Sequence, residues 1–229
     1  MAANSHASQN REQLPALTGG PKGSGLVELM PYLELGNLYN SLGGGAGCIN
    51  STVPIFMCPS AVDQATAGRT HYTMCVGTRI DYATNPGGAG GDGDNSWTPG
   101  TGGDGSGTDP TGYGADGAGA FGTSVTSMAS MARDGASNTV LYSEKSDSGL
   151  INGGDMNQVA FHSGNQPNNN RDSASFDALS ETHAHSNHPG GVNAAFGDAH
   201  VEFISNNVNI GLWKALSTAN GGEAWGLAG

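Results

Sequence analysis

Histidines and carboxylates, the residue types that bind transition metals, gather in the C-terminal third of the chain. They are His162, His183, His185, His188, His200, Asp177, Glu181 and Asp198. A helix over 177–188 would place Asp177, Glu181, His185 and His188 on one face. However, the sequence SNHPGG that follows His185 is typical of a loop, and no H-E-x-x-H motif occurs. We therefore expect polar loop residues here and no transition-metal site.

A second candidate is the segment 87–122, in which 15 of 36 residues are Gly and no Lys or Arg occurs. Its carboxylates, Asp92, Asp94 and Asp104, would suit calcium, which prefers oxygen ligands on flexible backbone. Neither the EF-hand pattern nor a nonapeptide calcium repeat is present. The composition favours a long inserted surface loop. The sequence implies no definite cofactor, and calcium is the ion such a loop would bind.

Nucleophilic catalysis has no recognisable signature in this chain. There is no G-x-S-x-G elbow and no phosphate-binding glycine motif, and Cys58 is followed by Pro-Ser rather than by a cysteine-hydrolase pattern. We expect no catalytic residues and no enzymatic activity. Trp97 and Tyr113, inside the glycine-rich loop, would contact a glycan or a partner protein if they are exposed, or would attach the loop to the domain.

Three cysteines, Cys48, Cys58 and Cys75, lie within one short stretch and lack the spacing of a zinc knuckle or a redox motif. In an oxidising compartment they predict one disulfide and one remaining thiol. The pairings Cys58–Cys75 and Cys48–Cys58 both stay open, and three reduced thiols are the alternative.

The overall charge argues against nucleic acid as a partner. The formal net charge is −12, with only 8 Lys and Arg residues, and they are not clustered. Phosphate recognition requires a basic surface, so nucleic acids and anionic membrane surfaces are unfavourable partners. Charged residues make up only 12% of the chain, which is low for a globular protein. An acidic, neutral-polar surface of this kind is typical of an extracytoplasmic protein.

The elements expected in the N-terminal half are short. Residues 2–13 resemble the end of a helix, and residues 24–42 carry apolar side chains near the helical period, with Pro31 starting a second helix and Gly43–Gly45 ending it. Two apolar, β-rich runs over 52–59 and 71–77 predict strands. Together with the elements below, they indicate one α+β domain over 1–229, with helices packed on an antiparallel sheet.

The C-terminal half contains the clearest local pattern. We expect strands over 137–144 and near 159–161, and then a hairpin in which two β-rich runs flank Gly197-Asp198. Ala199 after the Asp disfavours a type I′ turn, so we expect a type I turn with a bulge. Asn209 is placed to cap a closing helix over 210–216.

Several segments resemble a large family of bacterial prepilin-type, pseudopilin-like proteins, also classed as solute-binding. The family motif is a His, nine residues and Asp-Gly; here His188 is followed by nine residues and Asp198, with Ala199 in place of Gly. Further agreement lies in residues 29–40 (LMPYLELGNLYN), 56–60 (FMCPS), 134–144 (DGASNTVLYSE) and 212–223 (LWKALSTANGGE). The glycine-rich loop is outside the resemblance.

The resemblance implies a pilin-like head that follows a long hydrophobic N-terminal helix. It suggests a non-enzymatic, membrane-anchored protein in the periplasm or at the cell surface, in a type IV pilus or type II secretion-like assembly. Other pilin-like subunits would be its partners through that helix. We expect His188 and Asp198 to be structural, with Asp198 accepting turn N–H bonds and His188 bonding to the base of the hairpin; the alternative is that the two form a metal- or ligand-binding pair. The alternative function is an extracellular solute- or glycan-binding module.

Overall fold

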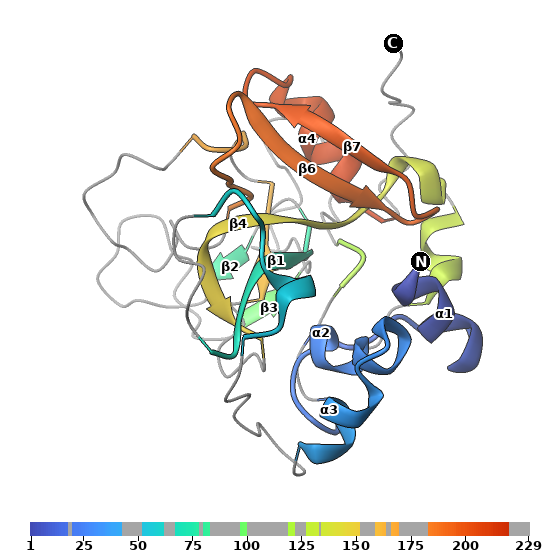
Figure 1. Cartoon of the computed structure of the whole chain (residues 1–229). Coiled ribbons are helices and arrows are strands. Elements are labelled where there is room, and N and C mark those ends of the chain that lie inside the picture. Colours follow the sequence, from blue (N-terminus) through green and yellow to red (C-terminus); the bar gives the residue numbers. More distant parts are fainter. Residues whose placement is uncertain are drawn as a thin grey trace.

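A computed structural model describes most of the chain. The described residues are 1–17, 20–42, 52–61, 67–77, 80–82, 97–99, 119–121, 127–132, 134–151, 159–163, 166–169 and 183–219. Within them, no helix is both long and apolar enough to cross a membrane. The fold is α+β, as the sequence predicts: short helices lie against a five-stranded sheet (Figure 1).

Helical segments dominate the N-terminal part of the chain. They are α1 (Ala2–Gln9), α2 (Gly25–Glu28), the 3-10 helix η1 (Met30–Leu33), α3 (Gly36–Ser41) and the 3-10 helix η2 (Pro54–Phe56). Pro31 occupies the first turn of η1, where a missing N–H costs nothing. The strand expected over 52–59 is wrong. Pro54 starts η2 instead, since its fixed φ and missing N–H oppose strand pairing.

The main sheet has the order β5-β1-β4-β6-β7. Its strands are β1 (Arg69–Cys75), β4 (Val140–Leu150), β5 (Ala160–Phe161), β6 (Gly191–Phe196) and β7 (Val201–Ser205). Among these described strands, only β1 and β5 pair in parallel, and the other pairs are antiparallel. Two 3-10 helices, η3 (Met128–Ala132) and η4 (Ala136–Asn138), precede β4, so β4 begins later than the sequence predicts.

The glycine-rich segment is not a surface loop throughout. Part of it forms β3 (Trp97–Pro99), which pairs antiparallel with β2 (Ile80–Tyr82) in a separate two-stranded sheet. Near its end, Ala120 and Phe121 are buried. The N–H of Phe121 donates to Cys75 O at 3.1 Å. Phe121 therefore belongs to the core although glycines surround it in the sequence, because its backbone is bonded to β1 and burial of its aromatic ring is favourable.

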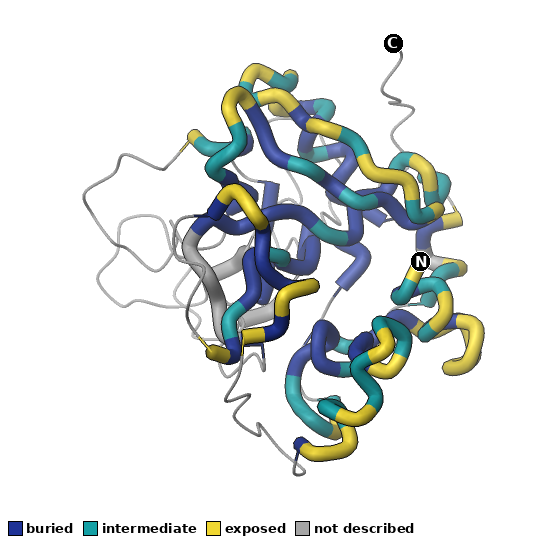
Figure 2. Tube along the Cα trace, in the orientation of Figure 1, coloured by how far each residue is buried: buried dark blue, intermediate teal, exposed yellow. Residues whose placement is uncertain are grey.

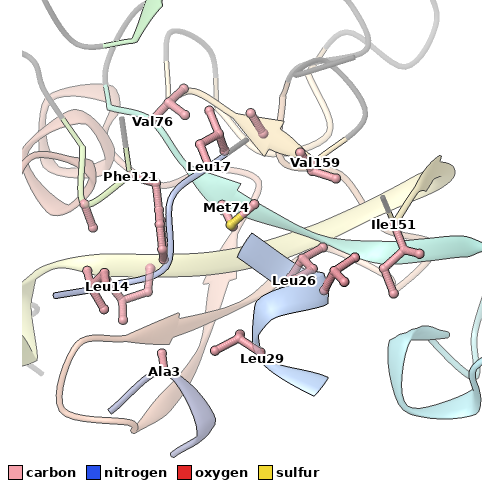
Figure 3. Packing of buried hydrophobic residues seen from close by; sticks show 14 of the residues in the cluster. Ala3, Leu14, Leu17, Leu26, Leu29, Met74, Val76, Phe121, Ile151 and Val159 are labelled. Carbon is pink, nitrogen blue, oxygen red and sulfur yellow. The ribbon is translucent and has the colours of Figure 1, made fainter. Parts of the chain in front are cut away.

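Two buried hydrophobic clusters stabilise the sheet. The larger joins the N-terminal helices to the sheet and includes Leu14, Leu26, Met74 and Phe121 (Figure 3). The second contains Phe161 and Trp213, whose rings stack with centroids 6.0 Å apart, and it holds the closing helix α4 (Ile210–Ser217) against the sheet. Figure 2 shows that β6 is largely buried whereas β7 is largely exposed at the sheet edge.

The turn of the β6–β7 hairpin contains a left-handed alanine. The N–H of Ala199 donates to Phe196 O at 2.9 Å, and the N–H of Phe196 donates to His200 O at 3.0 Å. Ala199 has φ +76°. This pattern matches a type I turn followed by a left-handed bulge residue, which is the turn that the sequence predicts. A Cβ in this conformation is strained, which accounts for the Gly that the resembling family has here.

The Ala199→Gly substitution tests this strain. We expect the free energy of unfolding to rise by roughly 0.5–1 kcal/mol, since the relief of left-handed strain exceeds the entropy that Gly adds to the unfolded chain. Urea denaturation measures the change. Ala195→Gly, within the regular β6, is the control and should lower stability. Equal losses for both variants would show that the turn is unstrained.

The cap of α4 gives a second prediction. The side chain of Asn209 accepts bonds from the N–H groups of Gly211 at 2.8 Å and Leu212 at 3.2 Å. Asn209→Ala should therefore cost about 1 kcal/mol of unfolding free energy. The exposed Asn207→Ala, two residues earlier, is the matched control and should stay within about 0.5 kcal/mol of the wild type. Indistinguishable denaturation midpoints for the two variants would contradict the assigned cap.

Candidate functional site

Three side chains that are remote in sequence meet beside the middle strand of the sheet. Cys58 follows η2, Glu144 lies on β4, and His188 lies in the loop before β6. The Nε2 atom of His188 is 3.0 Å from Oε1 of Glu144 and 3.5 Å from Sγ of Cys58. Sγ of Cys58 is 3.8 Å from the same Oε1 atom. We call these residues the Cys–Glu–His cluster.

Glu144 occupies the point at which β4 loses its regular pairing with both neighbours. The β4–β6 pairing extends to Ser143 opposite Ala194. The β1–β4 register jumps directly after Glu144, which is opposite Tyr72. Beyond this point, the carbonyl of Glu144 accepts the N–H of His185, in the loop before β6, at 3.0 Å. The irregular pairing turns the Glu144 side chain toward that loop.

The carboxylate of Glu144 is buried and fully engaged. Its Oε2 atom accepts the N–H of Asn193 at 2.8 Å, which takes the place of the next ladder bond of β6. Its Oε1 atom accepts the Asn193 side-chain amide at 3.1 Å. The side chain of Glu144 is only 4% exposed. A buried carboxylate is stable only with such donors, so Asn193 fixes where both oxygens point.

The other two side chains of the cluster are also positioned by hydrogen bonds. The N–H of Cys58 donates to Nδ1 of His71 on β1 at 3.1 Å. The N–H of His188 donates to Oγ of Ser186 at 3.1 Å, and that hydroxyl donates to the carbonyl of Gly191 at 2.7 Å. These bonds therefore fix the backbone that carries the thiol of Cys58 and the imidazole of His188.

The geometry does not form a nucleophilic relay. In Cys–His hydrolases one ring nitrogen faces the thiol and the other faces the orienting group. Here the thiol and the carboxylate both face Nε2 of His188. All three ligand atoms lie within 4.8 Å of one another. A thiolate, an imidazole and a carboxylate converging on one point are a donor set suited to a transition metal.

Burial and nearby charge affect one further residue, Tyr72. Its pKa is raised, chiefly because burial disfavours the phenolate and further because Cys58 and Glu144 lie near it. The Tyr72 hydroxyl therefore stays protonated beside the cluster.

The histidines expected to gather in the C-terminal third separate into different surroundings. His185 accepts the N–H of Ser146 at 2.9 Å through Nδ1. His162 and His183 lie side by side, with ring centroids 4.2 Å apart. His200 contacts Asp198 at the hairpin turn. Residues 183–190 form no helix, and Asp177 and Glu181 lie outside the described residues.

His188 and Asp198 do not meet, although they define the sequence motif. They lie at opposite ends of β6. Asp198 is exposed, and its carboxylate accepts the N–H of His200 at 3.1 Å, as predicted for a turn residue. This bond, together with the His200 side chain, lowers the pKa of Asp198. His188 bonds to Glu144 on β4 rather than to the base of the hairpin.

The cysteines correct one sequence prediction. Cys58 and Cys75 are separate buried thiols, so the pairing Cys58–Cys75 is absent. Cys75 Sγ donates to the carbonyl of Ser217 at 3.4 Å, within the cluster around α4, whereas Cys58 contacts Glu144 and His188. Burial raises the pKa of the Cys75 thiol to about 12. Cys48 lies outside the described residues.

Other predicted sites fall outside the described part of the chain. Asp92, Asp94, Asp104 and Tyr113 are among the residues that the structure does not describe, and for Trp97 only the backbone of β3 is described. The calcium site and the glycan-contacting aromatics therefore stay predictions.

Sequence reasoning missed the Cys–Glu–His cluster, although one signal was available. Each member lies in a segment that carries the family resemblance: Cys58 in 56–60, Glu144 in 134–144 and His188 at the start of the C-terminal motif.

Comparison with known proteins gives one result. A family model described as SBP_bac_10, protein of unknown function (DUF1559), matches residues 2–211. No curated protein and no solved structure matches the chain.

The buried histidine pair generates a testable pH dependence. The pKa of His162 is lowered from 6.5 to about 3, first by burial and then by the neighbouring His183 and Lys214. Below pH 6.5 the unfolded chain therefore binds a proton that the folded chain does not. Stability should fall as the pH decreases from about 6.5 to about 3, by about 1.4 kcal/mol per pH unit for this group.

The measurement is urea unfolding at several pH values for the wild type and His162→Gln. The wild type should lose more stability than His162→Gln over this range. His6→Gln, which changes a histidine on α1 outside this pair, is the control and should follow the wild type. Parallel curves for the wild type and His162→Gln would show that His162 titrates normally in the folded protein.

Proposed function

The chain belongs to the DUF1559 family, whose function is unknown, and we propose that it is the non-enzymatic head of a membrane-anchored, pseudopilin-like envelope protein. In this proposal a hydrophobic helix precedes α1 and anchors the protein, and the head lies in the periplasm or at the cell surface. Other pilin-like subunits are the partners, in a type IV pilus or type II secretion-like assembly.

The observation that carries the proposal is an apolar groove around the start of α1. The groove has a volume of about 270 Å³, and its lining includes Met1, Leu33, Ile55 and Val201. Two of these side chains are exposed: Ile55 by 51% and Val201 by 65%. Exposed apolar side chains that gather in one place indicate a contact surface. In an assembly, a helix of a neighbouring subunit would cover this surface.

The packing of α1 supports the same role. Ala3 and Ala7, one helical turn apart, are buried against the head. The amide of Asn4 donates to Gly197 O at 3.1 Å at the hairpin turn, and the ring of His6 packs edge-on against Tyr32.

The acidic surface, with a net charge of −12, agrees with a partner that is neither nucleic acid nor an anionic membrane surface. The Cys–Glu–His cluster lacks the arrangement of a nucleophilic relay, because the thiol and the carboxylate face the same ring nitrogen.

Crosslinking in cells that produce the full-length protein tests this role. We expect Ser5→Cys, on the exposed side of α1, to form crosslinks between subunits in the membrane fraction. Ser205→Cys is the matched control, because Ser205 is also exposed but lies at the end of β7 remote from the hairpin turn. It should give few crosslinks. Equal crosslinking at both positions, or recovery of a monomer outside the membrane fraction, would refute the assembly.

A further inference from the structure

We infer that the Cys–Glu–His cluster is a zinc site, in which Cys58 Sγ, one carboxylate oxygen of Glu144 and His188 Nε2 bind a single Zn²⁺ ion. This inference is independent of the proposed assembly, since it concerns side chains inside the head. It shares His188 with the histidine group considered from the sequence, but Cys58 and Glu144 were not among those candidate ligands.

The separations between the ligand atoms fit a tetrahedral ion. Zinc lies about 2.3 Å from sulfur, about 2.0 Å from nitrogen and about 2.0 Å from oxygen, so tetrahedral angles place two ligands about 3.3–3.6 Å apart. The observed separations are 3.5 Å for Cys58 and His188, 3.0 Å for His188 and Glu144, and 3.8 Å for Cys58 and Glu144. Adjustments of a few tenths of an ångström bring all three into range.

The donor types select the ion. Calcium and magnesium prefer oxygen ligands, and a thiolate with an imidazole excludes them as natural occupants. Zinc accepts sulfur, nitrogen and oxygen together. With three protein ligands, the fourth position is open to water. The His188 side chain is 27% exposed, which gives both the ion and this water a path from solvent.

The surroundings hold the ligands as a metal site requires. The two N–H groups of Asn193 orient the Glu144 carboxylate at 2.8 Å and 3.1 Å. The bond from the Cys58 N–H to His71 orients the segment that carries the thiol. Such outer contacts fix ligand geometry before the ion arrives and raise affinity. The ligands come from three separate segments, so the bound ion would link η2, β4 and the loop before β6.

The alternative is a hydrogen-bonded cluster that binds no metal. In that case the imidazole of His188 donates to Glu144, and the thiol of Cys58 packs beside them. The two arrangements differ in what happens to the thiol, because zinc binding requires a thiolate and releases protons. Metal binding can therefore be detected directly, because it converts the thiol of Cys58 into a metal-bound thiolate.

In the first experiment, the protein is purified without a histidine tag and any bound metal is removed with a chelator. The metal-free protein is then titrated with Zn²⁺ in competition with a chromophoric chelator, which reports the free zinc. We expect one equivalent to bind. A 100-fold excess of free zinc over Kd should raise the thermal midpoint by about 5–10 °C. Co²⁺ in place of zinc should give a thiolate-to-metal charge-transfer band in the near ultraviolet, which only a cysteine ligand produces.

The variants Cys58→Ser, Glu144→Gln and His188→Gln should each weaken zinc binding by about 100-fold or more, since even residues outside the ligand shell change affinity 10–100-fold. Cys75→Ser and His200→Gln are the controls. They remove the same residue types elsewhere, so they should bind zinc as the wild type does. Circular dichroism shows which variants fold.

Three results would overturn the zinc site. The first is binding of less than about 0.1 equivalent to the folded wild type, and the second is Co²⁺ binding without a charge-transfer band. Both are measured on the unaltered protein and do not depend on whether a variant folds. The third is one bound equivalent that persists in folded Cys58→Ser and His188→Gln, which would place the ion elsewhere. Crosslinking through α1 is unaffected by any of these results, so failure of the zinc site and failure of the assembly are distinguishable.

Discussion

The buried carboxylate of Glu144 is the constraint on which the centre of this fold depends. Burying a charged group costs several kcal/mol unless donors surround it. Asn193 supplies two N–H donors from β6, and His188 supplies an imidazole from the preceding loop. These contacts determine where β4 separates from β6 and how the loop returns to the sheet. They also place the thiol of Cys58 against the same oxygen.

The two hydrophobic clusters explain why the cysteines have separate roles. Cys75 lies with Phe161 and Trp213 in the cluster that receives α4. Cys58 instead contacts the polar side chains of Glu144 and His188. A thiol surrounded by apolar side chains behaves as a small hydrophobic residue, whereas a thiol beside an imidazole and a carboxylate has partners suited to metal chemistry. The packing of the surrounding side chains, and not the compartment in which the protein works, gives each of the two cysteines its environment.

Elements formed by local interactions could be predicted from the sequence. The hairpin follows from two β-rich runs around Gly197-Asp198, and α4 from the Asn209 cap and its apolar residues. Two expectations failed, for different reasons. Residues 52–59 look like a strand by composition, yet Pro54 begins a 3-10 helix, because its fixed φ and missing N–H oppose strand pairing. Phe121 ends a glycine-rich stretch, yet it is buried against Tyr142 with ring centroids 5.2 Å apart.

The sequence by itself therefore determined the α+β class, the hairpin and the closing helix, because neighbouring residues encode turns, caps and periodicity. Only the tertiary structure decided which polar residues meet. Glu144 is 44 positions from His188 and 86 from Cys58, and Cys58 is 130 from His188. No local spacing links residues so far apart. The His188–Asp198 motif, by contrast, joins two residues that β6 holds at its opposite ends, because an extended strand separates whatever flanks it.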